Sequence, residues 1–424
     1  MTGMTTYMVG GLGGVNIVIS PLTSINPIYA NVLYYQQFTA QGGTGPYTWA
    51  NTTVLPQGLT LYSNGNLIGN TRTATSYSFT VQATDSATPT HHVGTRPYSG
   101  TITYYSYSVT YTIIGGGAQG GFGPIAASVG GGGGAGGIVC GSFSFCYSGN
   151  SANTYKIIIG AGGGVFSNNP GYKSYVTYCT PTLSGFGNVV ACGGGYGGGY
   201  VSSPGYASCG GAGGSGGGGA AYITNPGTPT GKAFSYGGAG TGPQGNSGGQ
   251  GYYTTPTGAI EGGGGGGAST GGNAGSCVAT GGYGGTGKQF VQYSPYGAYV
   301  NPSLYPTTST APGYGWFGGG GGGGAPSSTR QGGLGGGGQG GTGSAAATPG
   351  ATNTGGGGGG GGSAGPAGSG GYPITGGGAG GGSGIVFLTV PTQYYPGNAP
   401  GASVVKVCGP NTILAYTGTG TYKT

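Results

Sequence analysis

The sequence predicts an all-β protein in which an N-terminal β-sandwich is followed by a glycine-rich domain built on a small β scaffold. Three observations predict this fold class. Short apolar runs with a period of two recur through the first 114 residues, which contain only 13 of the 119 glycines. Residues 115–384 hold 101 of the other glycines, and β-branched runs adjoin the glycine blocks. No apolar pattern of useful length has the helical period.

The first 114 residues divide into an N-terminal segment, residues 1–17, and the predicted sandwich, residues 18–114. Its strand-like runs are VNIVIS, YSFTVQAT and SYSVTYTII, with the turn signals GGTGPY and SNGN. Alternation gives each strand one buried face. The residues expected on that face are Leu59, Leu61, Leu67, Tyr77, Phe79 and Val81, with Trp49 as an anchor of the core. Pro46 favours a turn, and Gly58 and Gly65 permit a positive φ between strands.

Three motifs in this region resemble the immunoglobulin-like, cadherin-like module of many surface and phage proteins. They are YYQQFTAQGGTGPYTW, LPQGLTLYSNGNLIGN and YSFTVQATDSATP, in that order. The resemblance implies an immunoglobulin-like β-sandwich. The sequence departs from the family at IGNTRT, where Ser-Gly-Thr-Pro is usual. A calcium site like that of true cadherins needs several carboxylates, and Asp85 stands alone, so we expect no calcium.

The glycine-rich domain is predicted to span residues 115–390. The runs TYTIIGGG, TYKIIIGAGGG and GSGIVFLTV predict scaffold strands that carry long glycine-rich insertions. TYTIIGGGAQGG, YKIIIGAGG and GGGSGIVFLTV also resemble the three strand segments of the glycine-rich domain of phage tail-fibre tips and related adhesins, although the usual Arg of the closing strand is missing. The resemblance implies packed polyglycine II helices and variable tip loops that contact a host receptor. Residues 391–424 are expected to add two further strands.

A run of eight consecutive glycines, Gly355 to Gly362, decides whether the glycine blocks are spacers or structure. Ordering this run costs on the order of 10 kcal/mol of backbone entropy. Polyproline-II-like chains make no internal hydrogen bonds, so their N–H and C=O groups need neighbouring chains if they are buried. Only glycine lets such chains crowd together on every side. We therefore expect the run to be ordered inside a bundle.

Charged residues are scarce and scattered. Nine Lys and Arg and two acids, Asp85 and Glu261, give a net charge of +7 without a basic cluster. Nucleic-acid binding needs clustered Lys and Arg, so we expect none. The N-terminus has neither a charged region nor an apolar stretch long enough to span a bilayer, so we expect no signal peptide and no membrane insertion.

The seven cysteines contain no C-x-x-C pair, and the histidines His91 and His92 are far from them in sequence, so no zinc site is expected. The cysteines are either small buried hydrophobes or disulfide partners. The pairs that we consider first are Cys140 with Cys146 and Cys192 with Cys209.

Catalytic groups are missing from the sequence. The two acids lie far apart, which disfavours a paired-carboxylate mechanism. His91 and His92 lie in a predicted loop, TPTHHVGTRP. A dinucleotide fingerprint fails at KIIIGAGGGVFS, because Val165 occupies the position of the last glycine. We expect a protein that is not an enzyme and has no cofactor or metal.

Tyrosine and tryptophan interrupt the glycine pattern, most of all between residues 288 and 317. Aromatic rings on Gly- and Ser-rich loops give large contact area at low entropic cost, as in antibody paratopes. The candidate receptor contacts are Tyr293, Tyr296, Tyr299, Tyr305, Tyr314, Trp316 and Phe317. The alternative role for these rings is structural, sealing the ends of the glycine bundle.

Together these features favour a non-enzymatic phage or virus host-recognition protein, a tail-fibre adhesin or virion surface protein. Its expected partners are a host cell-surface polysaccharide or outer-membrane protein and other virion subunits, in an oligomer on the virion surface or outside the cell. The alternative is a structural subunit of a virion decoration layer or an extracellular filament. In that case a free VNIVIS strand near the N-terminus would pair with an edge of the next subunit.

Overall fold

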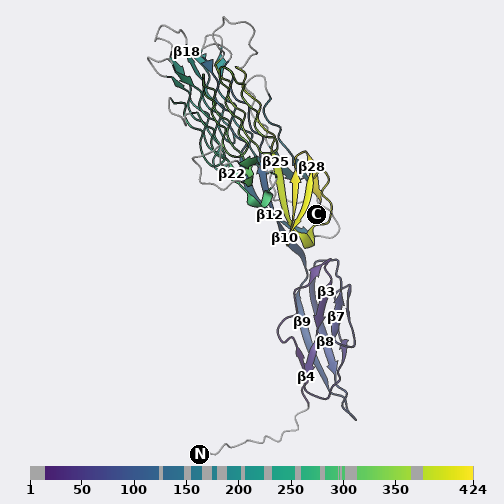
Figure 1. Cartoon of the computed structure of the whole chain (residues 1–424). Helices are drawn as coiled ribbons and strands as arrows, with labels where there is room; N and C mark the ends of the chain where they lie inside the picture. Colours follow the sequence, from purple (N-terminus) through teal and green to yellow (C-terminus); the bar gives the residue numbers. More distant parts are fainter. Residues whose placement is uncertain are drawn as a thin grey trace, which may run out of the picture. The chain divides into compact units, whose positions relative to one another are not determined.

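The chain folds into strands and turns that form two compact units (Figure 1). The computed structural model describes residues 15–123, 128–147, 154–164, 174–178, 189–201, 206–223, 232–253, 259–276, 282–294, 296, 298–300, 313–363 and 376–423. The N-terminal unit extends to Tyr107 and includes Ser144–Ala152; the glycine-rich unit comprises Ser108–Phe143 and Asn153–Thr424. Within the described residues, the helical elements are two single-turn 3-10 helices, η1 (Val291–Tyr293) and η3 (Thr392–Tyr394).

The N-terminal unit is built from antiparallel sheets. One sheet has the order β5 (Thr48–Asn51), β8 (Ser76–Thr84), β9 (Val93–Thr101), and the other β3 (Tyr34–Gln37), β7 (Asn66–Gly69), β6 (Leu59–Leu61). A short pair joins β1 (Val18–Ser20) to β4 (Thr39–Gln41), and β2 (Tyr29–Ala30) runs parallel to β10 (Thr103–Ile114). The predicted sandwich is confirmed as an all-β module of paired sheets.

The core of this unit contains the side chains that the period-two alternation of apolar residues predicts to be buried. On β8 the buried residues are Phe79, Val81 and Ala83, separated by partly exposed ones. Trp49, Leu59 and Leu67 are buried in the same cluster, and Leu61 and Tyr77 pack against it. Gly58 and Gly65 have positive φ, as their turns require. The hydrophobic pattern therefore predicted this core residue by residue.

The N-terminal strand is not free. VNIVIS pairs through β1 with β4 inside the unit, in the register Val18↔Gln41. Ile17 and Ile19 are buried in the core, because alternation directs both side chains to the same face. The prediction of a free VNIVIS strand that pairs with the next subunit is therefore wrong.

The scaffold of the glycine-rich unit is a six-stranded sheet. Its order is β12 (Ile138–Tyr147), β10, β25 (Ile385–Pro391), β27 (Asn411–Tyr416), β26 (Val404–Cys408), with β2 paired to β10. A second sheet has the order β15 (Val189–Ala191), β14 (Ser174–Tyr178), β13 (Thr154–Ile158), β28 (Gly420–Lys423). The three predicted scaffold runs are β10, β13 and β25. The final residues, expected to add two strands, form three, β26, β27 and β28, which belong to these two sheets.

The glycine segments between these strands are bonded laterally with a period of three. Successive N–H groups of residues 130–137 donate to three different neighbouring segments in rotation, so every third N–H donates to the same segment. The donors and acceptors are Gly130 to Gly361, Gly133 to Gly358 and Gly136 to Gly355; Gly131 to Gly198, Gly134 to Gly195 and Gly137 to Cys192; and Gly132 to Gly263 and Ala135 to Gly266, with N···O distances of 2.8 to 3.0 Å. Three residues per turn is the period of an extended polyproline-II-like chain.

The eight-glycine run is buried within these segments. From Gly355 to Gly361 every N–H donates a hydrogen bond and every C=O accepts one. A Cβ built on Gly133 would overlap the carbonyl oxygen of Ala118, and one built on Gly358 would overlap that of Ala379. Glycine is required at both positions because another backbone occupies the space of a side chain. The run is thus an ordered part of the interior.

Candidate functional site at the ribbon end

Short β ribbons gather at one end of the glycine-rich unit, which we call the ribbon end. They are β11 (Ser128–Val129) with β18 (Ala221–Ile223) and β19 (Lys232–Phe234), β16 (Tyr200–Val201) with β17 (Tyr206–Ala207), and β20 (Tyr252–Tyr253) with β21 (Ile260–Glu261). β17, β18, β19, β20 and β21 contact one another across the ribbons. Figure 1 shows β18 at this end of the unit and β22 (Lys288–Gln289) and β25 at the other.

The glycine segments hold the ribbon end apart from the scaffold. Residues 130–137 begin directly after β11 and end directly before β12. At about 3.1 Å per residue, this segment is roughly 25 Å long. Neighbouring ribbon strands are joined by residues 202–205, 224–231 and 254–258, which lie outside the described residues. The arrangement is a set of hairpins whose bases are fixed to a hydrogen-bonded support.

Aromatic side chains line the ribbon end. Phe234 is 49% exposed and Tyr236 is 65% exposed, and their rings meet edge to face with centroids 6.1 Å apart. Tyr222 is buried against Tyr200, with ring centroids 4.6 Å apart. Burial, together with a hydrogen bond and the charge of Tyr200, raises the pKa of Tyr222. The inner rings therefore support the ribbons, whereas Phe234 and Tyr236 face solvent.

A buried ion pair ties β21 to a distant segment. The Nε–H of Arg330 donates to Oε1 of Glu261, and the Ser276 N–H donates to Oε2 at 2.8 Å. Glu261 is the only acidic residue of the unit, and both side chains are largely shielded from solvent. Burial lowers the pKa of the Arg330 guanidinium. The pair and the Ser276 N–H join three glycine-rich segments.

The predicted receptor contacts whose side chains the structure describes, Tyr293, Tyr296, Trp316 and Phe317, lie at the opposite end of the unit. Tyr293 and Phe317 are buried against Phe387 of the scaffold sheet, and the Tyr293 ring stacks on Phe387 at 4.0 Å. Trp316 is buried beside Leu334, and Tyr296 is half-buried against Phe387. The prediction that Tyr293, Trp316 and Phe317 are exposed contacts is wrong: a large apolar ring beside a β-branched sheet gains more from burial than from exposure. Tyr305 and the side chains of Tyr299 and Tyr314 lie outside the described residues.

The disulfide predictions are contradicted by the geometry. Cys140, Cys192 and Cys209 are free thiols. Cys140 and Cys146 lie on the single strand β12, where six residues at about 3.3 Å each separate them by roughly 20 Å. The N–H of Ser208 bonds to Gly199 and that of Gly214 to Gly193, so Cys209 and Cys192 lie at opposite ends of the paired segments, roughly 19 Å apart. A disulfide needs a Cα separation of about 4.4–6.8 Å.

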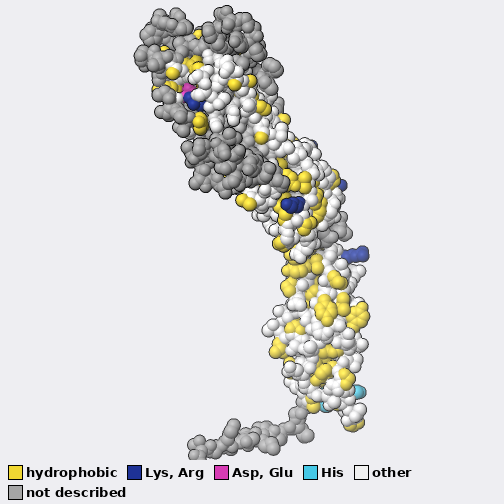
Figure 2. Space-filling view, viewed as in Figure 1, with side chains coloured by type: hydrophobic (Ala, Val, Ile, Leu, Met, Phe, Trp, Pro, Cys, Tyr) yellow, Lys and Arg dark blue, Asp and Glu magenta, His cyan; other side chains and the backbone are white. Residues whose placement is uncertain are grey.

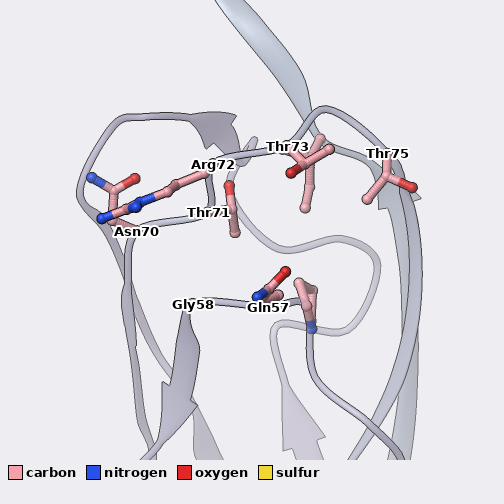
Figure 3. A pocket seen from close by; sticks show the side chains of 9 residues that line it. Gln57, Gly58, Asn70, Thr71, Arg72, Thr73 and Thr75 are labelled. Atoms are coloured by element: carbon pink, nitrogen blue, oxygen red, sulfur yellow. The ribbon is translucent and has the colours of Figure 1, made fainter. Parts of the chain in front are cut away.

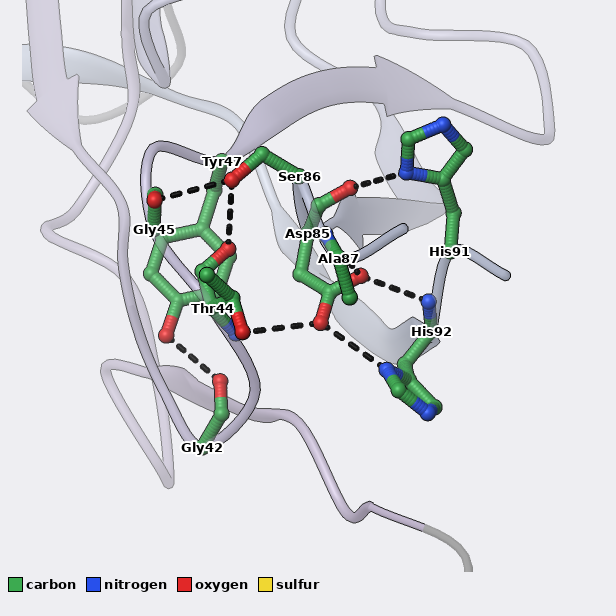
Figure 4. A network of polar contacts seen from close by, with 9 residues as sticks. All are labelled: Gly42, Thr44, Gly45, Tyr47, Asp85, Ser86, Ala87, His91 and His92. Atoms are coloured by element: carbon green, nitrogen blue, oxygen red, sulfur yellow. Dashed lines mark hydrogen bonds and ion pairs between the residues drawn. The ribbon is translucent and has the colours of Figure 1, made fainter. Parts of the chain in front are cut away.

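A second polar centre lies in the N-terminal unit, in the loop between β8 and β9 (Figure 4). The buried Asp85 carboxylate accepts hydrogen bonds from the N–H groups of Thr44, Ala87 and His92 and from Nδ1 of His92 at 2.9 Å. Burial alone would raise the pKa of Asp85, but these hydrogen bonds outweigh it and hold the pKa below its usual range. His91 bonds through Nδ1 to the Asp85 carbonyl. These contacts fasten a loop.

Over the described part of the chain, no group of three or more His, Cys, Asp or Glu residues is placed to hold a metal ion. Charged side chains appear only as isolated spots on the visible face (Figure 2). The described elements include no helix with the length and apolar character of a membrane span.

Sequence reasoning missed Phe234 and Tyr236. The signal was present in KAFSYGG, where two rings follow a short strand run directly before a glycine block. The similar motif GYGWFGGG has buried rings at Trp316 and Phe317. The two motifs lie at opposite ends of the glycine-rich unit, and the sequence alone does not reveal that.

Comparison with known proteins covers the N-terminal unit. Residues 16–114 match the family model described as Putative Ig domain. This match confirms the immunoglobulin-like module and agrees with the all-β structure of the unit. No curated protein and no solved structure matches the chain.

Proposed function

We propose that this chain is a non-enzymatic host-recognition protein, a phage tail-fibre adhesin or virion surface protein, that binds a cell-surface receptor through the loops of the ribbon end. The observation that carries the proposal is the combination of a hydrogen-bonded glycine support with hairpins held together at one of its ends. Antibody recognition likewise presents aromatic contacts on a rigid base, and here the exposed rings of Phe234 and Tyr236 stand at the end of β19 and just after it.

The bonding pattern also supports a polyglycine II interpretation of the segments. The N–H groups of residues 130–137 serve three neighbours in turn, which is what a threefold chain surrounded by like chains requires. Such a support loses little entropy when the tip binds, because its backbone is already ordered. Rigid presentation reduces the cost of association.

The proposed receptor is a cell-surface polysaccharide or an outer-membrane protein, and the proposed location is the virion surface or the extracellular space. Phe234 and Tyr236 offer flat apolar faces and a phenolic hydroxyl, which suit sugar rings and mixed protein surfaces alike. Each contact is weak, so several copies per particle would supply avidity.

Binding of the labelled full-length chain to a panel of bacterial isolates, measured by flow cytometry, tests the proposal. We expect at least one isolate to retain the chain, and the double variant Phe234→Ser/Tyr236→Ser to lose about tenfold or more in binding. The matched control is Tyr62→Ser, which removes a similarly exposed ring from the N-terminal unit. Retention by no isolate, or equal retention of the wild type and the double variant, would contradict it.

A structural subunit is the second candidate function, and a different strand now favours it. β26 is an outer strand of the scaffold sheet, and Val405 and Val407 on it are exposed. Outer strands can pair with another chain, and the exposed Lys406 on this one opposes such pairing. Analytical ultracentrifugation with negative-stain microscopy distinguishes the candidates: filaments or sheets would establish the subunit, whereas discrete particles would favour the adhesin.

A further inference from the structure

An open pocket lies in the immunoglobulin-like unit between residues 56–58, which precede β6, and residues 70–75, which precede β8 (Figure 3). Its volume is about 650 Å³. Thr71 and Ile102 in its wall are only 2% and 1% exposed, so a ligand would meet mainly the Arg72 guanidinium and exposed amide and hydroxyl groups. A single exposed cation among such groups does not define a ligand, and we assign none to this pocket.

The scaffold sheet has an outer strand, β12, whose one neighbour in the order of the sheet is β10. In the described part of the chain, three outer strands have five residues or more: β9, β12 and β26. β9 contains Arg96 and Pro97, and β26 contains Lys406, which are residue types that keep outer strands from pairing with another chain. β12, with the sequence IVCGSFSFCY, is the longest of the three and contains no charged residue and no proline.

One face of β12 is open to solvent beyond the first residue of the strand. The Ile138 N–H donates to the Gln244 carbonyl at 3.0 Å, which ties this first residue to a glycine-rich segment. The exposed residues that follow on the same face are Cys140, Ser142 and Ser144. A partner strand that adjoins residues 139–147 would therefore meet small polar side chains on this face and would bury no charge.

The sequence of β12 is nearly symmetric about Phe143. One residue away on both sides is a serine, and three residues away on both sides is a cysteine. When two copies of the strand lie antiparallel with Phe143 opposite Phe143, every residue from 139 to 147 has a partner, serine faces serine and cysteine faces cysteine. Aromatic pairs and hydroxyl pairs directly opposite each other stabilise antiparallel strands. The symmetry therefore specifies both the partner and the register.

We propose that β12 pairs in this register with β12 of a second copy of the chain, so that the scaffold sheet continues across a two-fold axis at Phe143. Two identical strands use the same surface on both copies, and such a contact closes into a dimer rather than a filament. The inference goes beyond the ribbon-end proposal and does not rest on it, because it concerns how two copies join rather than what they bind.

The two cysteines of β12 also fit this dimer. Within one strand Cys140 and Cys146 are roughly 20 Å apart, too far for a disulfide. In the dimer each stands directly opposite the other of the second copy, where antiparallel Cα atoms are about 4.5–5.5 Å apart, within the range that a disulfide spans. The dimer itself is held by main-chain hydrogen bonds and does not require this bridge, but the cysteines report its register.

Sedimentation equilibrium of the full chain under reducing conditions tests the pairing. We expect a dimer that dissociates on dilution. The double variant Ser142→Lys/Ser144→Lys brings ammonium groups directly opposite each other twice in each dimer, and at low ionic strength it should weaken association by about tenfold or more. The matched control is Val405→Lys/Val407→Lys, which adds the same groups at exposed positions of the other outer strand, β26, and should leave the dimer unchanged. Thermal melts establish that each variant is folded.

Thiol cross-linking with diamide tests the register. Two thiols give up two protons and two electrons as the disulfide forms, and diamide takes them up to become a hydrazine. We expect peptide mapping of the covalent dimer to find Cys140 joined to Cys146, a link that a single strand cannot make. Cys146→Ser should abolish this product, whereas Cys209→Ser, which removes an exposed thiol elsewhere in the unit, should not.

A chain that stays monomeric, a dimer that Ser142→Lys/Ser144→Lys leaves intact, or cross-links that join other cysteines but not Cys140 to Cys146 would each overturn the proposal. Dissociation by the β26 variant alone would overturn it as well and would place the contact on that strand. None of these measurements involves cells or the ribbon end, so the cell-binding experiment remains an independent test of the proposed function.

Discussion

The interiors of the two units differ: one consists of side chains and the other of backbone. In the immunoglobulin-like unit the interior consists of large side chains such as Phe38, Leu67 and Phe79, all of them fully buried. In the glycine-rich unit the interior consists of backbone, and the N–H and C=O groups of one segment are satisfied by the segments around it. The first interior is held by the hydrophobic effect, and the second by hydrogen bonds.

The difference shows how a chain with few apolar side chains can still fold. Each ordered glycine costs about 1–2 kcal/mol of backbone entropy, and each hydrogen bond returns a net of about 1 kcal/mol. The two terms nearly cancel, so a single glycine segment gains little by itself. Stability requires that neighbouring segments share their bonds, which makes the bundle cooperative and sensitive to any atom that keeps two backbones apart. The two units should therefore respond to opposite kinds of substitution.

The largest effect is expected when a small group is added to the centre of the bundle. Gly133→Ala places a methyl group where the Ala118 carbonyl oxygen lies, and only a shift of whole segments can relieve the overlap. We expect a loss on the order of 5 kcal/mol in the unfolding free energy of the glycine-rich unit. Denaturant unfolding with hydrogen exchange measures it.

The control for this substitution is Gly377→Ala in the same unit, where a Cβ meets no atom within 4 Å. It should change the unfolding free energy by less than about 1 kcal/mol. Equal effects of the two substitutions would mean that close backbone approach does not hold the unit together.

The next effect is expected when volume is removed from the side-chain core. Leu67→Ala in the immunoglobulin-like unit leaves a cavity at a fully buried position. We expect a loss of about 3 kcal/mol, confined to the transition of that unit. Scanning calorimetry resolves the two transitions, and Tyr62→Ala, at an exposed position, serves as the control. A matching loss in the glycine-rich unit would show that the two interiors are not independent.

The contrast also explains what the sequence could predict. In the immunoglobulin-like unit a period of two identified Leu59, Leu67, Phe79 and Val81, because side-chain alternation is itself the cause of their burial. In the glycine-rich unit the scaffold strands could be found from their β-branched runs. The neighbours of each glycine segment could not be predicted, because glycine carries no side chain that would specify which segment lies beside it. Trp316 and Phe317 were consequently proposed as receptor contacts, with a structural role as the alternative, and they lie in the interior.

A smaller effect is expected from the ion pair between Glu261 and Arg330. Glu261→Gln removes the charge that faces Arg330 while it keeps the size of the side chain. We expect a loss of about 2 kcal/mol in the unfolding free energy of the glycine-rich unit, because the neutral amide no longer offsets the charge of the largely buried guanidinium. A double-mutant cycle with Arg330→Met measures the coupling. Additive losses from the two single variants would mean that the pair does not fix the register of the segments.

The smallest effect concerns the response of the immunoglobulin-like unit to acid. Asp85 has a pKa below its usual range in the folded protein because N–H groups of the loop and His92 bond to its carboxylate. A depressed folded pKa contributes stability that is fully present above the unfolded value, about 3.9, and is lost as the pH falls below it toward the folded value. The melting temperature of the immunoglobulin-like unit should therefore decline below about pH 4.

Asp85→Asn should lower this melting temperature at neutral pH and flatten its acid decline, since the amide cannot accept the same bonds and does not titrate. The backbone hydrogen bonds of the glycine-rich unit have no proton equilibrium in this range, so Asp85→Asn should leave the transition of that unit unchanged at every pH. An acid decline of equal steepness in the wild type and in Asp85→Asn would assign the acid sensitivity to groups other than this loop.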